Sequence, residues 1–118
     1  MGASFKDLIA WQKAVNLTEE IYRLTASFPS HEQFGLTHQL RRASVSIASN
    51  IAEGYGRSTK GEYLQFLGHA RGSNCELQTQ LVIAERIGFG SRKAYEAAET
   101  LSADVSRLLI ALMNRLKS

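Results

Sequence analysis

The side chains best suited to metal binding or nucleophilic chemistry are three histidines and one cysteine: His31, His38, His69 and Cys75. A zinc site takes its ligands at short, regular spacings, and these residues do not have such spacings. His69 and Cys75 project from different sides of a helix, so only tertiary contacts could pair the thiol with the imidazole. The sequence therefore predicts no metal site and no catalytic centre, and Cys75 is expected to be a small buried packing residue.

A second candidate is the stretch Gly56–Gly61, whose two glycines have the spacing of a phosphate-binding loop. Such a loop also needs Lys-Ser or Lys-Thr at its end and a β-strand before it. Glu62 and Tyr63 follow the second glycine instead, and the preceding residues have helical periodicity. We expect a connection between helices here. The sequence thus predicts no cofactor, no small-molecule substrate and no enzymatic activity.

Basic residues form a third candidate, a surface for a polyanion. The net charge is +3, and residues 38–71 hold five Arg or Lys against two Glu. This mild excess permits structured RNA or DNA as a partner, bound mainly through its phosphates and therefore in a salt-dependent way. Each candidate could equally be an ordinary solvated charge; the candidates are Arg41, Arg57, Lys60, Arg71, Arg92 and Lys93.

The stretch RRASVSIASNIAEGYGR, residues 41–57, also suggests a polar seam between helices. At 100° per residue its apolar positions share one face, Asn50 lies at the edge of that face, and Arg42 and Glu53 lie opposite it. We expect Arg42 to pair with Glu76, and Asn50 to hydrogen-bond Asn74 and fix the helix register. The predicted structural seam is Arg42, Asn50, Glu53, Asn74 and Glu76, with direct ligand contact as the alternative.

Four segments with helical periodicity must position these side chains, at about residues 5–27, 32–54, 59–87 and 91–117. Gly54 or Gly56 is expected to take a left-handed cap, Thr59 and Glu62 have the spacing of a capping box, and Gly88 closes the third segment. The short connections predict a single-domain, all-α protein that folds as an antiparallel up-down-up-down four-helix bundle.

The first segment is apolar on two sides, which a helix of a monomeric bundle does not need. One stripe is Ala14, Leu17, Ile21, Leu24 and Phe28, and the other is Leu8, Trp11, Val15 and Tyr22. The third segment carries a stripe of small residues, Gly68, Gly72, Cys75 and Thr79. We expect this small stripe to pack tightly against the second helix, or alternatively against a helix of another subunit. The two apolar sides of the first segment predict a homo-oligomer.

With 118 residues, 44% of them hydrophobic, the chain has room for one core. No segment approaches the roughly 18 apolar residues of a membrane span, and no leader is recognisable. A single cysteine agrees with a reducing compartment. We therefore expect a cytoplasmic protein without a membrane partner.

Three blocks of the sequence resemble the small four-helix bundle proteins encoded by intervening sequences of bacterial 23S rRNA genes. The blocks are FKDLIAWQKA, LRRASVSIASNIAEGYGRS and EYLQFLGHARGSNCELQTQL, and they keep the order and spacing of that family over nearly the whole chain. One departure is Ala48, where the family usually has a proline. The second helix should therefore be straighter at this position.

The resemblance implies a four-helix bundle that assembles into a homopentameric ring. A related branch serves diversity-generating retroelements as an accessory subunit, where a basic ring is associated with nucleic acid and a reverse transcriptase. The resulting hypothesis is a non-enzymatic oligomeric bundle that associates with RNA, DNA or nucleoprotein through a weakly basic surface. The alternative is a protein–protein adaptor that docks a larger partner, such as a polymerase, without contacting nucleic acid.

Overall fold

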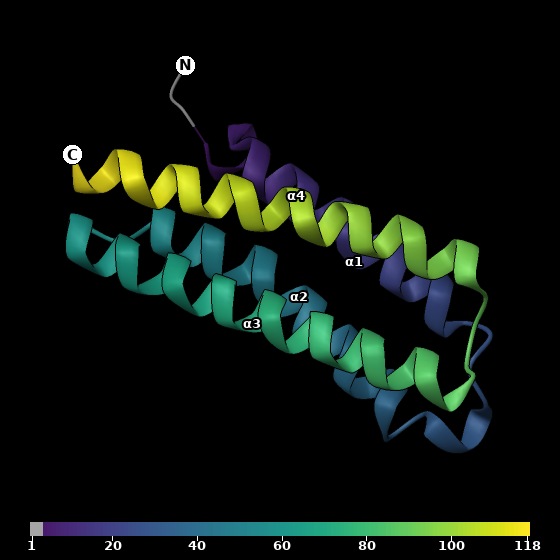
Figure 1. The fold of residues 1–118 in the computed structure, drawn as a ribbon. Helices are drawn as coiled ribbons and strands as arrows, with labels where there is room; N and C mark the ends of the chain where they lie inside the picture. Colours follow the sequence, from purple (N-terminus) through teal and green to yellow (C-terminus); the bar gives the residue numbers. More distant parts are fainter. Residues whose placement is uncertain (1–3) are drawn as a thin grey trace.

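The computed structural model describes residues 4–118, and four long helices form its body. They are α1 (Ile9–Thr25), α2 (Leu36–Tyr55), α3 (Lys60–Ile87) and α4 (Arg92–Lys117). Consecutive helices run in opposite directions (Figure 1), and no strand occurs within the described residues. The prediction of an all-α chain with four antiparallel helices is confirmed.

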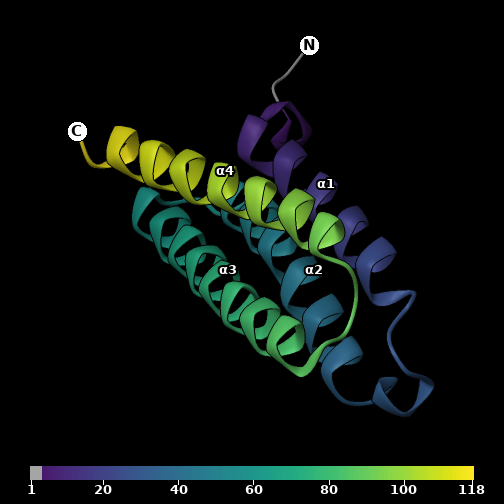
Figure 2. The same ribbon diagram turned by 45° about the vertical axis from the view of Figure 1, so that its right-hand side comes forward.

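Different helix ends and turns meet at the two ends of the bundle (Figures 1 and 2). At the terminal end, the start of α1 and the end of α4 lie near the turn between α2 and α3. At the distal end, the end of α1 and the start of α2 lie near the turn between α3 and α4. Residues 57 and 115, far apart in sequence, therefore belong to the same end of the molecule.

Each helix buries one apolar stripe whose members recur every three or four residues. The first expected stripe of α1 is buried, and so is the expected core face of α2, with Leu40, Ser44, Ile47 and Ile51 fully inaccessible. The largest buried side chain is Tyr95 of α4. Its hydroxyl donates a hydrogen bond of 2.5 Å to the Phe89 carbonyl, so the polar atom of this ring does not go unpaired in the core.

Two helices begin later than predicted because short 3-10 turns precede them. The first of these turns is Phe5–Asp7, in which the Ser4 N–H donates a hydrogen bond to the Asp7 carboxylate at 3.1 Å. Extended backbone at Leu8 separates this turn from α1. Ser30–Glu32 is the second. The Glu32 carboxylate accepts a hydrogen bond from the Leu36 N–H at 2.9 Å, which makes Leu36 the first residue of α2.

The caps at the ends of α2 and α3 differ in part from expectation. The left-handed cap predicted at Gly54 or Gly56 is wrong, because Gly54 lies inside α2 and Gly56 has a φ of −79°. Thr59 caps α3 as predicted, accepting a hydrogen bond from the Glu62 N–H at 3.1 Å. Gly88 closes α3 in the left-handed region, with a φ of +100°.

The glycine that matters for packing is Gly54, where α2 and α3 approach most closely. A Cβ placed on Gly54 would lie 2.7 Å from the Cβ of Phe66 and 3.1 Å from the ring of Tyr63. The stripe expected to pack against α2 faces solvent instead: a Cβ on Gly68 or Gly72 would meet nothing within 4 Å. Cys75 belongs to that stripe and is exposed, so its predicted burial is also wrong.

Buried polar residues connect α3 to its two neighbours. The buried Asn74 amide donates to the Ser102 carbonyl at 3.0 Å and accepts from the Ser102 hydroxyl at 2.7 Å, which joins α3 to α4. The Asn50 amide donates to the Ser46 carbonyl at 2.8 Å, and the Ser46 hydroxyl shares a 2.9 Å hydrogen bond with that of Ser73, which joins α2 to α3. The expected hydrogen bond between Asn50 and Asn74 is not formed: the Asn50 amide bonds Ser46 within α2, and the Asn74 amide bonds Ser102 of α4.

Replacing Gly54 by alanine should lower the free energy of unfolding by about 1–3 kcal/mol, because the new methyl group overlaps the rigid Phe66 Cβ. The matched control is Gly72→Ala, which adds the same methyl group into open space and should raise stability by about 0.5–1 kcal/mol. Urea unfolding followed by circular dichroism measures both. Equal effects of the two substitutions would contradict the close approach at Gly54.

Replacing Ser102 by alanine should cost about 1–3 kcal/mol, because it removes the hydroxyl that donates to the buried Asn74 amide oxygen. The control Ser58→Ala, at an exposed position of the turn between α2 and α3, should change stability by less than about 0.5 kcal/mol. The measurement is the shift of the urea midpoint at constant slope. A shift no larger than that of the control would mean that Asn74 does not depend on Ser102.

Candidate nucleic-acid interface

The six predicted basic contact residues do not form one surface. Arg57 and Lys60 belong to the α2–α3 turn at the terminal end, whereas Arg92 and Lys93 begin α4 at the distal end (Figure 1). Arg41 lies in the first half of α2, also toward the distal end, and Arg71 is exposed along α3. A single compact contact with nucleic acid cannot include all six.

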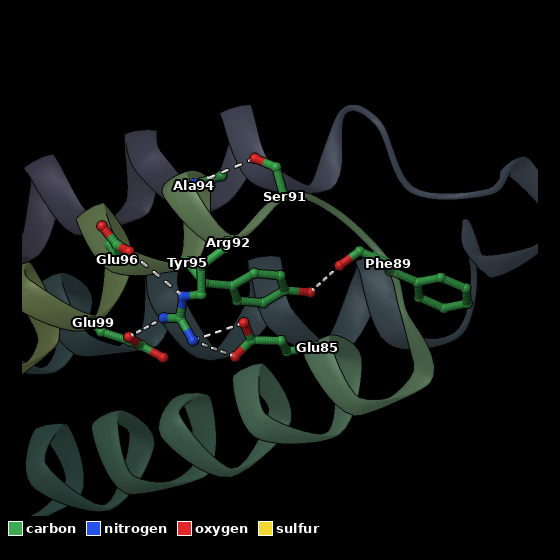
Figure 3. A network of polar contacts seen from close by, with 8 residues as sticks. All are labelled: Glu85, Phe89, Ser91, Arg92, Ala94, Tyr95, Glu96 and Glu99. Atoms are coloured by element: carbon green, nitrogen blue, oxygen red, sulfur yellow. Dashed lines mark hydrogen bonds and ion pairs between the residues drawn. The ribbon is translucent and has the colours of Figure 1, made fainter.

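Arg92 is held by three carboxylates around the α3–α4 turn (Figure 3). Its guanidinium lies 2.7 Å from the Glu85 carboxylate and 3.8 Å from that of Glu96, and it also pairs with Glu99. Glu96 and Glu99 follow Arg92 at the helical spacings of four and seven residues, a signal that was visible in the sequence. Because its charge is compensated, Arg92 does not belong in the candidate interface.

The same ion-pair group surrounds the buried phenol of Tyr95 (Figure 3). Burial raises the pKa of Tyr95 to about 12; the Glu85 carboxylate adds to this rise and the Arg92 guanidinium opposes it. The phenol therefore stays protonated at neutral pH and keeps its hydrogen bond to the Phe89 carbonyl. The polar contacts at the distal end hold the turn together and have no feature of a reactive site.

Arg41 also has a structural role, between α2 and α1. Its guanidinium lies 4.4 Å from the centre of the Tyr22 ring, and its Nε donates to the Thr25 hydroxyl at 2.9 Å. Cation–π contact leaves the positive charge uncompensated, but the side chain is half-buried and fixed by two partners. Of the three distal candidates, Arg41, Arg92 and Lys93, Lys93 alone is exposed without an ion pair in the described residues.

The terminal end carries five exposed bases, of which Lys6 lies in the turn before α1. The other four come from the α2–α3 connection and the last turn of α4, and we call them the basic cluster: Arg57, Lys60, Arg115 and Lys117. Within residues 4–118, none of these four side chains has a carboxylate within 4.0 Å. The last turn of α4 supplies two of them, and residue-by-residue reading of the sequence missed both. The predicted topology contained the signal, because in an up-down-up-down bundle the end of the fourth helix lies beside the turn between the second and third.

Aromatic side chains lie among these bases. The Arg57 guanidinium is 4.7 Å from the centre of the Phe66 ring, and Phe66 contacts His69 edge to face at 5.8 Å between ring centres. Burial raises the pKa of Tyr63, the neighbouring Tyr55 raises it further and Arg115 lowers it. One base of the cluster, Arg57, therefore lies over an aromatic ring, a contact that the sequence pattern did not predict.

The charged members of the predicted polar seam do not pair. Arg42 and Glu76 line the same groove between α2 and α3, a cavity of about 580 Å³, yet no ion pair joins them within the described residues. Both side chains are exposed, so water solvates each charge and little is gained by pairing. Glu53 is likewise exposed. The groove carries charges of both signs and is not a polyanion site.

Two members of the second apolar stripe, Trp11 and Val15, line an open groove between α1 and α2 with a volume of about 340 Å³. Its apolar lining is Trp11, Val15, Val45, Ala48 and Ala52. Trp11 is only half-buried, even though the ring of Phe5 contacts it edge to face at 5.4 Å. We call this surface the α1–α2 groove. The described residues of the chain leave it accessible.

Residues 4–118 contain neither a cluster of metal ligands nor a helix that could span a membrane. In that part of the chain no group of three or more His, Cys, Asp or Glu side chains could hold a metal ion. The three histidines are exposed and lie on different elements. None of the helices described is both long and apolar enough to cross a membrane.

Comparison with known proteins bears on this geometry. The family model described as 23S rRNA-intervening sequence protein matches residues 6–111. The fold is shared with a crystal structure of a protein with unknown function from the S23 ribosomal protein family of Bacteroides thetaiotaomicron. The two structures superpose with a TM-score of 0.83 at 23% sequence identity, and the match covers 92% of this chain and 98% of the other. A search of curated proteins found no match. Because the family match spans most of the sequence, this chain belongs to the family of 23S rRNA-intervening sequence proteins.

Proposed function

We propose that this protein is a non-enzymatic helical bundle that binds nucleic acid, RNA in the first place, through the basic cluster at its terminal end. The observation that carries the proposal is that four exposed bases without a carboxylate partner in the described residues, Arg57, Lys60, Arg115 and Lys117, lie at one end of the bundle. Arg92, at the other end, has three carboxylate partners. An exposed, uncompensated cation releases counterions when it neutralises a phosphate, which supplies most of the affinity of sequence-independent binding.

Lys93 and Arg71 remain secondary candidates in this proposal, since both are exposed. Arg41 contributes its electrostatic field but little direct contact with nucleic acid, because Tyr22 and Thr25 hold its side chain. The rival hypothesis, a protein–protein adaptor docking a polymerase or similar partner, uses the α1–α2 groove in place of the basic cluster. Nuclease treatment of complexes purified from cells separates the two, because only protein–protein contacts survive it.

We further propose that the α1–α2 groove binds a second copy of this chain, so that the protein works as a homo-oligomer; the family resemblance implies a pentameric ring. Open apolar surface is buried in stable assemblies, and in this groove Val45 is 44% exposed. Assembly also strengthens nucleic-acid binding, because several weak basic clusters on one particle act together.

Charge reversal at the basic cluster should abolish most of the nucleic-acid binding. The double variant Lys60→Glu/Lys117→Glu is expected to bind ribosomal RNA fragments at least about tenfold more weakly at low salt and to have a smaller salt slope. The control Arg23→Glu/Arg86→Glu makes the same change in net charge with exposed residues of the distal end that are not candidates for contact. Electrophoretic mobility shift titrations at several salt concentrations measure both, and equal losses would show that only net charge matters.

A charge in the α1–α2 groove should dissociate the oligomer. Light scattering of the unaltered protein should give a multiple of the 13.1 kDa chain mass, five chains if the ring forms, and Val45→Glu should give a monomer. The control is Val82→Glu on α3, a valine of similar exposure (48% against 44%) outside the groove. A mass of one chain for the unaltered protein at micromolar concentration would contradict the proposal.

A further inference from the structure

The contact at Gly54 sets the position of Arg57, the first base after α2. Gly54 lies against Phe66 and Tyr63 because it has no side chain, and its carbonyl accepts a hydrogen bond from the Arg57 N–H at 3.0 Å. The chain therefore turns immediately beside α3. This turn brings the Arg57 guanidinium to 4.7 Å from the centre of the Phe66 ring.

Phe66 is itself fixed from two sides. The backbone of Gly54 lies against its Cβ, and His69, one helical turn further along α3, contacts its ring at an interplanar angle of 80°. The ring is half-buried, whereas Arg57 and His69 are exposed. A planar cation thus lies on a fixed aromatic support at the surface of the molecule.

A guanidinium stacked on a ring retains one free face, and nucleobases that are not base-paired stack on such planes. Bases inside a duplex already stack on their neighbours and offer no face to the protein. Lys60, three residues after Arg57 and without an ion pair in the described chain, is a point charge suited to an adjacent phosphate. The carboxylate of Glu62, also in this region, accepts a hydrogen bond from the Thr59 hydroxyl at 3.1 Å.

We propose that Arg57, supported by Phe66, stacks on an unpaired nucleobase, so that the basic cluster selects single-stranded nucleotides over duplex. This inference rests on the proposed function, since it assigns the class of nucleic acid that the basic cluster binds. Stacking on a side chain contributes about 1–3 kcal/mol per base, which corresponds to a preference of roughly 5- to 150-fold. Because every base has a stacking face, the preference is for an unpaired strand and not for a sequence.

The test is fluorescence anisotropy with three labelled RNA probes of about 12 nucleotides, a length within the range of single-strand binding sites. One probe is unpaired, one is a duplex of the same length, and one is an unpaired strand with abasic positions. The unaltered protein should bind the first at least about fivefold more tightly than the other two. Arg57→Lys keeps the charge and removes the plane, so it should reduce this ratio toward one while retaining the salt dependence.

Two further variants complete the design. Phe66→Leu removes the support under the guanidinium and should also lower the preference for the unpaired probe, with circular dichroism used to show that the helices are intact. Arg115→Lys makes the same conservative change at a base that no ring supports in the described structure, and should leave the preference unchanged.

The possible results separate the two proposals. Equal binding of the three probes, or a preference that Arg57→Lys leaves intact, would overturn the stacking inference while salt-dependent binding through the basic cluster stands. If none of the probes binds at low salt, both proposals are wrong. A preference lost in Arg57→Lys and in Phe66→Leu but kept in Arg115→Lys is the expected result.

Discussion

The close approach of α2 and α3 at Gly54 is the constraint on which the terminal end depends. Only hydrogen fits there, because any β-carbon would overlap the Cβ of Phe66. The absence of a side chain at Gly54 has two consequences. The last turn of α2 packs directly against α3. The turn that follows then places the Arg57 guanidinium over the Phe66 ring. A packing requirement and a surface property therefore have the same cause.

The two ends of the bundle use arginine differently. At the distal end, Arg92 is neutralised by Glu85, Glu96 and Glu99 and stabilises the turn above the buried Tyr95 (Figure 3). At the terminal end, Arg115 and Lys117 lie in the last turn of α4, where the helix dipole favours positive charge without a carboxylate partner. Net charge alone does not distinguish these situations. The distribution of carboxylates decides which bases remain available to a phosphate.

The sequence determines the fold more clearly than the site. Apolar stripes with helical spacing predicted all four helices and the core face of α2, because burial of such a stripe dominates bundle stability. The sequence pattern misplaced the tight contact between α2 and α3. Gly68 and Gly72 have the helical spacing of a packing face but lie at the solvent surface, whereas the contact is made at the single Gly54. Asn74 was correctly placed beside the core, but its partner Ser102 depends on the rotation of α4, which periodicity does not define to one residue.

The α1–α2 groove and the basic cluster are neighbours along α2, and this relation connects the proposals. Ala52 lines the groove, and Arg57 follows little more than one helical turn later. A second copy seated in the groove would bring its own charges close to this Arg57, and several basic clusters would then act on one strand. Binding that is weak for one subunit becomes strong when several subunits are joined in one particle. Each contact with the strand raises the effective concentration of the strand at the neighbouring basic cluster. Assembly and nucleic-acid affinity should therefore fall together when the groove is disrupted, whereas changes in the basic cluster should affect affinity alone.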